Sequence, residues 1–292
     1  MKHLALISLL LVPMASFAGT KPAHPEMLVS TDWLANHLTE KNLVVVHIGP
    51  KVAEYDEGHI PGARFLPTEK IAAEKSSVKN ELLATEQLVV NLEALGISNK
   101  SRVVIYTGPE TATHATRLYW TLDYLGIAKK ASLLDGGLAK WKSENRPLSK
   151  EATIVAKRGV IRPKLQPKLI AHLDDVTAAS QNKSQAVLVD SRPENRYHEG
   201  HIPGAMPLFW GHTVASASRT DFLNLDDIRK AYESAGIKPG SKLITYCESG
   251  FQATHGYFTA KYLGYDVKMY DGSFQEWNDL KKQPVVTGDK PQ

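Results

Sequence analysis

Short apolar runs rich in β-branched residues alternate along the chain with longer amphipathic stretches. The runs lie at residues 44–46, 103–105, 187–189 and 243–245, and amphipathic stretches end at Gly126 and Gly264. Apolar runs of this length are typical of strands that are buried on both faces of a sheet. Glycine is the favoured residue just after a helix. The alternation predicts an α/β fold with a mainly parallel sheet.

The same landmarks occur twice in the same order. The run Gly-His-Ile-Pro-Gly-Ala stands at residues 58–63 and again at 200–205, and residues 115–126 align without gaps on 253–264. Trp141 recurs as Trp277, and these pairs keep an offset of 136 to 142 residues. Such self-similarity indicates a duplicated unit. The sequence therefore predicts two homologous domains, at residues 26–149 and 168–288, joined by an exposed basic and polar linker at 150–167.

The N-terminus has the three-part form of a secretory signal peptide. Residues 1–3 are a short basic start, residues 4–13 are almost wholly apolar, and Ser16 and Ala18 offer small side chains for cleavage before Gly19. The alternative is a membrane anchor, but the apolar run is too short to span a bilayer. The sequence predicts a signal peptide at residues 1–18 and a mature protein that is periplasmic or secreted, with no membrane contact after cleavage.

Composition narrows the functional classes. The 292 residues include 35 Lys and Arg, 31 Asp and Glu, and one cysteine, Cys247. One cysteine excludes an intrachain disulfide scaffold and a Cys-rich metal site. The net charge of +4 is mild and no long basic run is present, so nucleic acid is not an expected partner.

Cys247 directly follows the predicted strand at 243–246 and precedes a helical segment that is predicted to begin at Ala253. Ligands bind at this edge of open α/β sheets. Unpaired N–H groups of the loop and of the helix N-terminus stabilise a thiolate, so the pKa of the thiol is expected to be lowered. The alternative is a small buried cysteine without a chemical role.

These features together resemble the rhodanese sulfurtransferases. The resemblance rests on the tandem repeat, the Gly-His-Ile-Pro-Gly-Ala run in each half, and one cysteine heading a six-residue loop at 247–252. The segment at 190–197 also resembles the second-domain pattern of that family, and the resemblance covers residues 27–286. It implies two rhodanese-like domains, one active site in the second domain, and no cofactor. The first domain carries Thr107 where the second has Cys247, and His47 where the second has Asp190.

The resemblance also implies a mechanism. Cys247 takes the outer sulfur of a small sulfur-containing anion and holds it as a persulfide, which a thiophilic acceptor such as cyanide or a thiol removes. Asp190 organises the pocket, or alternatively caps a turn, and Arg196 binds the donor, or alternatively is only solvated. Backbone N–H groups of the loop cradle the persulfide; its residues after the cysteine are Glu248, Ser249, Gly250, Phe251 and Gln252. The Phe251 ring either covers the sulfur or packs on the neighbouring helix.

The donor stays open between thiosulfate and 3-mercaptopyruvate. Thiosulfate-specific members of the family carry basic residues after the cysteine, whereas Glu248 repels a dianion. Ser249 and Gly250 fit the mercaptopyruvate pattern, but Glu248 again does not. The extracellular location favours thiosulfate.

The residues around Cys247 and His198 also bear on three other functions: a cysteine phosphatase, a persulfide relay and a zinc site. A cysteine phosphatase requires an arginine six residues after the cysteine, where this chain has Ala253. A persulfide-relay module that acts on a partner protein would keep Cys247, and Glu248 would suit a cationic acceptor surface. His198 and His201 are too few to hold zinc, and their surroundings indicate a turn.

Overall fold

The structure, a computed structural model, describes residues 21–75, 78–109, 112–216 and 219–291. The predicted signal peptide at residues 1–18 lies outside the described residues. Within the described ranges, no helix is both long and apolar enough to cross a membrane.

Each half of the chain forms a five-stranded sheet in which all neighbouring strands are parallel. In the first half the order is β1 (Leu28–Val29), β7 (Ala131–Leu134), β6 (Arg102–Tyr106), β2 (Leu43–Gly49) and β3 (Arg64–Pro67). In the second half the equivalent order is β8 (Ile170–Ala171), β14 (Asp266–Tyr270), β13 (Lys242–Tyr246), β9 (Ala186–Asp190) and β10 (Met206–Pro207). The prediction of two homologous α/β domains is confirmed, and all four apolar runs are strands.

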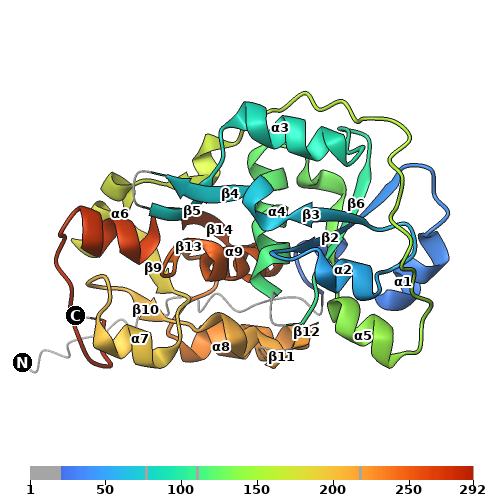
Figure 1. The fold of residues 1–292 in the computed structure, drawn as a ribbon. Helices are drawn as coiled ribbons and strands as arrows, with labels where there is room; N and C mark the ends of the chain where they lie inside the picture. Colours follow the sequence, from blue (N-terminus) through green and yellow to red (C-terminus); the bar gives the residue numbers. More distant parts are fainter. Residues whose placement is uncertain (1–20, 76–77, 110–111, 217–218, 292) are drawn as a thin grey trace, which may run out of the picture.

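Helices cover both faces of each sheet (Figure 1). The first half contains α1 (Thr31–His37), α2 (Ala53–Glu57), α3 (Thr85–Ala94), α4 (Ala112–Tyr124) and α5 (Gly137–Ser143). The second half contains α6 (Leu173–Ser180), α7 (Glu194–Glu199), α8 (Leu225–Ser234), α9 (Phe251–Leu263) and a π-helical turn at Gln275–Leu280. Helix α9 ends at Gly264 with φ of 93°, as the C-terminal glycine signal predicts.

The repeated Gly-His-Ile-Pro-Gly-Ala runs are turns, as their sequence predicts. His201 is fully buried, stacks on Tyr197 at 3.7 Å between ring centroids, and bonds the Tyr197 carbonyl through Nδ1 at 2.9 Å. His59 makes the same stack and bond with Tyr55. His198 is exposed and pairs with Asp289 on the surface. Each repeat therefore uses its histidine to fix the turn beside the sheet.

Helices α4 and α9 lie together at the centre of the molecule (Figure 1). The two halves are arranged around this helix pair with pseudo-twofold symmetry. Equivalent residues of the repeat meet here: the hydroxyl groups of Thr116 and Thr254 are 2.9 Å apart, and Asp123 pairs with Lys261. Phe258 of α9 belongs to a core cluster of the first half. Trp120 of α4 likewise belongs to a core cluster of the second half, so apolar side chains of each half pack into the other.

Each domain also extends a β-hairpin toward the other. The hairpin β4–β5 (Ala72–Lys75 and Val78–Leu82) of the first half lies over the second sheet, and β11–β12 (Val214–Ser216 and Arg219–Phe222) of the second half lies against α5 of the first (Figure 1). The Leu82 N–H donates to Asp271 Oδ2, and the Phe222 N–H donates to Asp135 Oδ1, both at 2.9 Å. Asp135 and Asp271 are equivalent in the repeat, so the two contacts are reciprocal.

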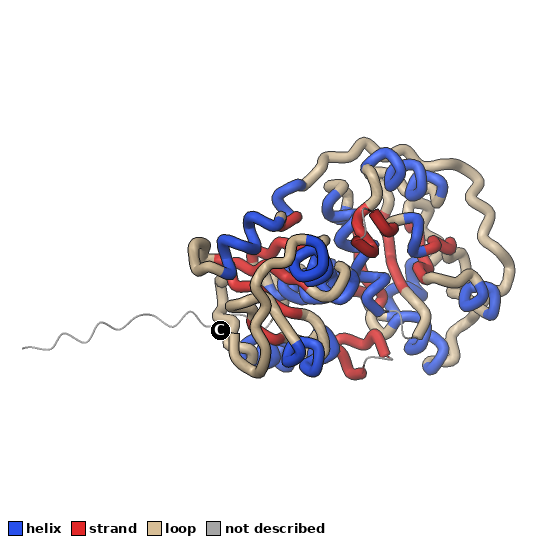
Figure 2. The backbone as a smooth tube through the Cα atoms, turned by 60° about the vertical axis from the view of Figure 1, so that its left-hand side comes forward, coloured by secondary structure: helices blue, strands red, loops and turns tan. Residues whose placement is uncertain are grey.

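The segment between the domains runs along the outside of the first half, as the long loop in Figure 2 shows. Residues 150–167 are largely exposed, as predicted, but they are not a free tether. Ile161 is buried in the first core, its N–H donates to Glu93 Oε1 at 2.8 Å, and the Lys164 N–H donates to the Leu125 carbonyl at 2.9 Å. The exact domain boundaries remain predictions.

Candidate active site

Cys247 stands at the carboxyl end of the central strand β13, at the point where the chain turns into α9. The helix begins at Phe251 rather than at Ala253, so the predicted start was two residues late. The loop proper is therefore residues 247–250, and Phe251 and Gln252 belong to the first helical turn. No side chain caps the start of α9, and the N-cap residue is Gly250 in a left-handed conformation.

The thiol is enclosed: Cys247 is 2% exposed. The Gly250 N–H points at Sγ from 3.1 Å. The loop that follows β14 holds the backbone of Cys247, since its N–H donates to Ser273 Oγ at 3.2 Å and its carbonyl accepts from the Phe274 N–H at 2.9 Å. Three hydrogen bonds from two segments, the loop of Cys247 itself and the loop after β14, therefore hold the cysteine in position.

The pKa of Cys247 is raised, which corrects the expectation of a lowered value. Burial is the largest cause, because a thiolate loses its hydration inside the protein. The backbone N–H groups of Ala253, Ser249 and Gly250 act in the expected direction and lower the pKa, while the charge of Asp190 adds to the increase. The N–H groups of Ser249, Gly250 and Ala253 therefore act on the sulfur, but desolvation has the larger effect on its pKa.

Gly250 is required by the shape of this loop. Its φ is 96°, a left-handed conformation that side chains rarely adopt. An added Cβ would lie 3.0 Å from Asp271 Oδ1 and 3.1 Å from Arg117 Nη1. Glycine at this position lets the N–H approach the sulfur and lets charged groups from two elements pack behind the loop.

Asp190 forms a buried ion pair at the end of β9, the strand next to β13. It is fully buried and binds the Arg192 guanidinium through both oxygens, at 3.0 Å to Nε and 2.7 Å to Nη2. It also accepts the Arg192 N–H at 2.9 Å, so it both caps a turn and holds the arginine. Sequence reasoning assigned Arg192 no role, although it belongs to the segment that carried the family resemblance.

Arg196 and Glu248 lie together at the exposed end of this charge cluster. The Arg196 side chain is 49% exposed and the Glu248 side chain is 44% exposed. Glu248 Oε2 lies 3.4 Å from Arg196 Nη2 and 3.2 Å from Arg192 Nη1. Glu199 binds the other Arg196 nitrogen at 2.6 Å. The structure therefore brings Arg196 to the active loop through Glu248.

The rest of the loop faces the first domain. Ser249 Oγ accepts a bond of 2.9 Å from Asn80 Nδ2 on strand β5. The half-buried Phe251 ring lies 4.7 Å from the His114 ring and 5.7 Å from the Arg117 guanidinium. Of the two predicted roles, packing on the neighbouring helix is the one that these contacts describe, and that helix is α4 of the other domain. Gln252 is half-buried in the same helical turn.

Arg117 is the contact between the domains that sequence reasoning missed. It is fully buried on α4, bonds Asp271 Oδ1 at 2.5 Å, and donates through Nη2 to the Asn80 carbonyl at 2.7 Å. An arginine inside the apolar repeat segment at 115–126 was the available signal. Its counterpart in the second half is His255, so the repeat departs from itself at this position.

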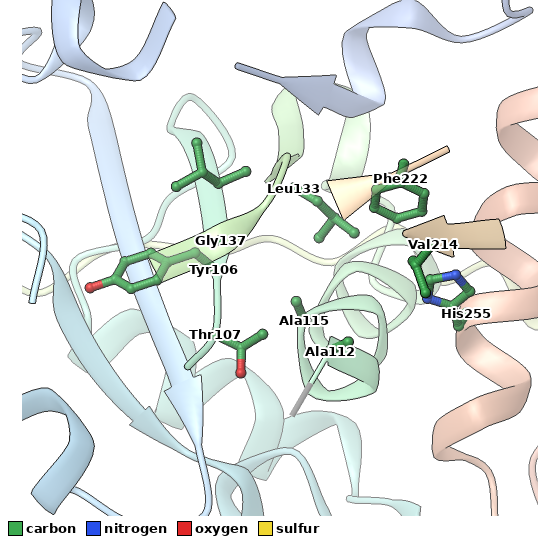
Figure 3. A pocket seen from close by; sticks show the side chains of 10 residues that line it. Tyr106, Thr107, Ala112, Ala115, Leu133, Gly137, Val214, Phe222 and His255 are labelled. Atoms are coloured by element: carbon green, nitrogen blue, oxygen red, sulfur yellow. The ribbon is translucent and has the colours of Figure 1, made fainter. Parts of the chain in front are cut away.

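The equivalent position in the first domain is occupied by Thr107, which has no thiol (Figure 3). Thr107 follows β6 as Cys247 follows β13, and its carbonyl accepts from the Leu138 N–H as that of Cys247 accepts from Phe274. A cavity of about 10 Å³ beside Thr107 is closed by Phe222 and His255 of the second half. That volume is about the size of one water molecule.

Comparisons with known proteins match both halves of the chain to one family. The family model described as Rhodanese-like domain matches the chain twice, at residues 30–144 and 173–280. The sulfur carrier protein TtuD of Thermus thermophilus is 32% identical over 92% of this chain and 99% of its own. A Mycobacterium leprae protein that is provisionally named a thiosulfate sulfurtransferase is 30% identical over 91% of this chain and 99% of its own.

Solved structures share the fold. SseA from Escherichia coli, described as a 3-mercaptopyruvate sulfurtransferase, superposes with a TM-score of 0.77 at 27% identity, over 85% of this chain and 98% of its own. A variant of EanB with a cysteine persulfide and ergothioneine superposes at 0.78 with 25% identity, over 91% of this chain and 71% of its own.

Two domain matches and these full-length relatives define the class. The chain belongs to the rhodanese family, as a tandem-domain member. Within that family it is a sulfurtransferase, with its one cysteine at the active-loop position of the second domain.

Proposed function

We propose that this protein transfers a sulfane sulfur from an anionic donor to a thiophilic acceptor through a persulfide on Cys247. The observation that carries the proposal is the enclosed Cys247 sulfur with the Gly250 N–H aimed at it from 3.1 Å. An N–H donor in this position stabilises negative charge on sulfur, both on the attacking thiolate and on the terminal atom of a persulfide.

The chemistry balances without a cofactor. With thiosulfate, the Cys247 thiolate attacks the outer sulfur, a new S–S bond forms, and the old S–S bond breaks to release sulfite. The terminal sulfur of the persulfide then bonds to cyanide or to a thiolate, and the Cys247 thiolate leaves. Because the pKa of Cys247 is raised, the thiol must first lose its proton, so deprotonation is part of the loading step.

We propose thiosulfate as the first donor to test and 3-mercaptopyruvate as the alternative. Both are anions, and Arg196 and Arg192 are cationic groups that contact the active loop through Glu248. The name of the M. leprae relative supports the first donor, and the description of SseA supports the second.

A relay role is the second candidate, and the name of TtuD, sulfur carrier protein, favours it. In that role the persulfide of Cys247 passes to a protein thiol, and turnover with cyanide is slow. The predicted signal peptide places this transfer outside the cytosol in our proposal. The mature chain then begins near Gly19.

Intact mass spectrometry of the purified mature protein tests the proposal. We expect one added sulfur atom after incubation with one of the two donors and none on Cys247→Ser. Loss of the added mass with cyanide supports the small-molecule transferase, and loss only with a protein thiol supports the relay. If neither donor adds sulfur while the thiol remains open to alkylation, the proposed function is wrong.

A further inference from the structure

A buried arginine of the first domain lies directly behind the loop that carries Cys247. Arg117 on α4 is fully buried, and its Nη1 bonds Asp271 Oδ1 at 2.5 Å. The same nitrogen would lie 3.1 Å from a Cβ added to Gly250, and the guanidinium lies 5.7 Å from the Phe251 ring. Arg117 therefore lies against the point at which the loop turns into α9.

The ion pair also holds the hairpin β4–β5 in place. Arg117 Nη2 donates to the Asn80 carbonyl at 2.7 Å, and Asp271 Oδ2 accepts the Leu82 N–H at 2.9 Å. Asp271 belongs to the segment after β14, which also bonds the backbone of Cys247. One buried ion pair thus joins α4, strand β5 and a segment that supports the cysteine.

Stability alone does not account for an arginine in this position. Burying a charge is costly, and Arg117 Nε has no hydrogen-bond partner among the residues that the structure describes. Apolar side chains of similar volume are often as stable as a buried ion pair. The position that the pair gives to its neighbours explains it better.

The repeat does not reproduce this pair at its other interface. The counterpart of Arg117 is His255, whose pKa burial lowers to about 3, so it carries no charge at neutral pH. Asp135, the counterpart of Asp271, pairs with Lys140 instead. Within the described part of the chain, the buried arginine pair therefore occurs at the interface that adjoins the thiol and not at its counterpart.

We propose that Arg117 is a positioning residue of this sulfurtransferase, which holds Gly250 where its N–H meets the Cys247 sulfur. The guanidinium and the Asp271 carboxylate fill the space behind the loop, so the loop cannot withdraw without uncovering a buried charge. An N–H donor 3.1 Å from the sulfur stabilises the thiolate. This inference rests on the proposed function and assigns to it a residue of the domain that has no thiol.

The pH profile of Cys247 alkylation tests the inference. Its inflection reports the protonation of the sulfur, whereas access to the sulfur changes only the plateau. We expect Arg117→Met to raise the inflection by about one pH unit, the size of one lost hydrogen bond to a charged group. Sulfur loading at pH 8 should then slow about tenfold, because less thiolate is present. Arg117→Lys, which keeps a cation beside Asp271, should recover most of both effects.

Lys261→Met is the matched control, because it removes an ion pair with Asp123 across the same two helices, at the opposite end of α9 from the loop. Circular dichroism shows whether each variant is folded. If Arg117→Met does not fold, its combination with Asp271→Asn takes its place, since that variant leaves no unpaired charge at the interface.

An unchanged inflection in the folded Arg117 variant overturns the inference, and so does an equal shift in Lys261→Met. The proposed function fails by a separate result, the absence of added sulfur on the wild-type chain. The alkylation profile does not depend on sulfur transfer, so the two failures are distinguishable.

Discussion

At the scale of single residues, two opposing effects determine the protonation of the Cys247 sulfur. Burial raises the pKa of Cys247, and three backbone N–H groups lower it, with burial the larger cause. A buried thiol that is protonated at neutral pH is protected from oxidation, since the thiolate is the reactive form. It becomes a nucleophile when it loses its proton inside a site that already holds hydrogen-bond donors for the negative sulfur.

This pKa direction predicts the pH dependence of alkylation. The rate constant for Cys247 with iodoacetamide should keep rising above the ordinary thiol pKa of about 8.5, because the folded protein favours the protonated form. The same chain unfolded in guanidinium chloride serves as the control, with an ordinary inflection. An inflection below 8.5 in the folded protein would show that the N–H groups outweigh burial.

At the scale of elements, the strand–loop–helix unit β13–α9 does most of the positioning. The strand brings Cys247 to the edge of the sheet, and the left-handed Gly250 allows α9 to begin four residues later with its N–H groups directed at the sulfur. The same unit in the first domain keeps the backbone frame around Thr107 but has no thiol. The two halves therefore differ at this position in a side chain, Cys247 against Thr107, rather than in the backbone scaffold.

Replacing Gly250 by Ala should both destabilise the protein and slow sulfur loading. A left-handed φ costs a side chain about 1–2 kcal/mol, and the added Cβ would also lie 3.0 Å from Asp271 Oδ1. Gly240→Ala is the matched control, since φ is 78° there and nothing lies within 4 Å of its added Cβ. Urea unfolding and the rate of mass gain with thiosulfate measure the two effects. Equal losses in both variants, with normal loading, would contradict the role given to Gly250.

At the scale of the whole molecule, the first domain contributes contacts to the candidate active site of the second. The hairpin β4–β5 and helix α4 bring Asn80 and Arg117 against Ser249, Phe251 and Asp271. The reciprocal hairpin β11–β12 makes the corresponding contact with Asp135, beside Thr107, which stands where the second domain has its cysteine. The pseudo-twofold arrangement thus produces two similar interfaces. One of them adjoins the loop that carries Cys247.

This asymmetry predicts different effects for equivalent substitutions. Asp271→Ala leaves the buried Arg117 charge unpaired, so we expect a loss of about 3–5 kcal/mol of unfolding free energy and slower sulfur loading. Asp135→Ala releases Lys140, which is partly exposed, so the loss should be about 1 kcal/mol, with loading within about twofold of the wild type. Chemical unfolding and mass-detected loading, applied to both variants, measure these effects. A loading defect in Asp135→Ala as large as that in Asp271→Ala would show that the second interface also serves catalysis.

The sequence by itself determined the duplicated α/β fold and the position of Cys247 after a buried strand, because apolar periodicity and repeat spacing are local signals. The resemblance of residues 190–197 and of the loop at 247–252 to the rhodanese pattern also singled out Asp190 and Arg196. Only the tertiary structure decided the raised pKa of Cys247, since desolvation depends on every segment that encloses the sulfur. It also decided the contacts of Asn80 with Ser249, of Arg117 with Asp271 and of Arg192 with Glu248. These partners are 169, 154 and 56 residues apart in the sequence. Contacts across a domain interface leave no spacing in the sequence, so their physical basis appears only once the two halves are packed together.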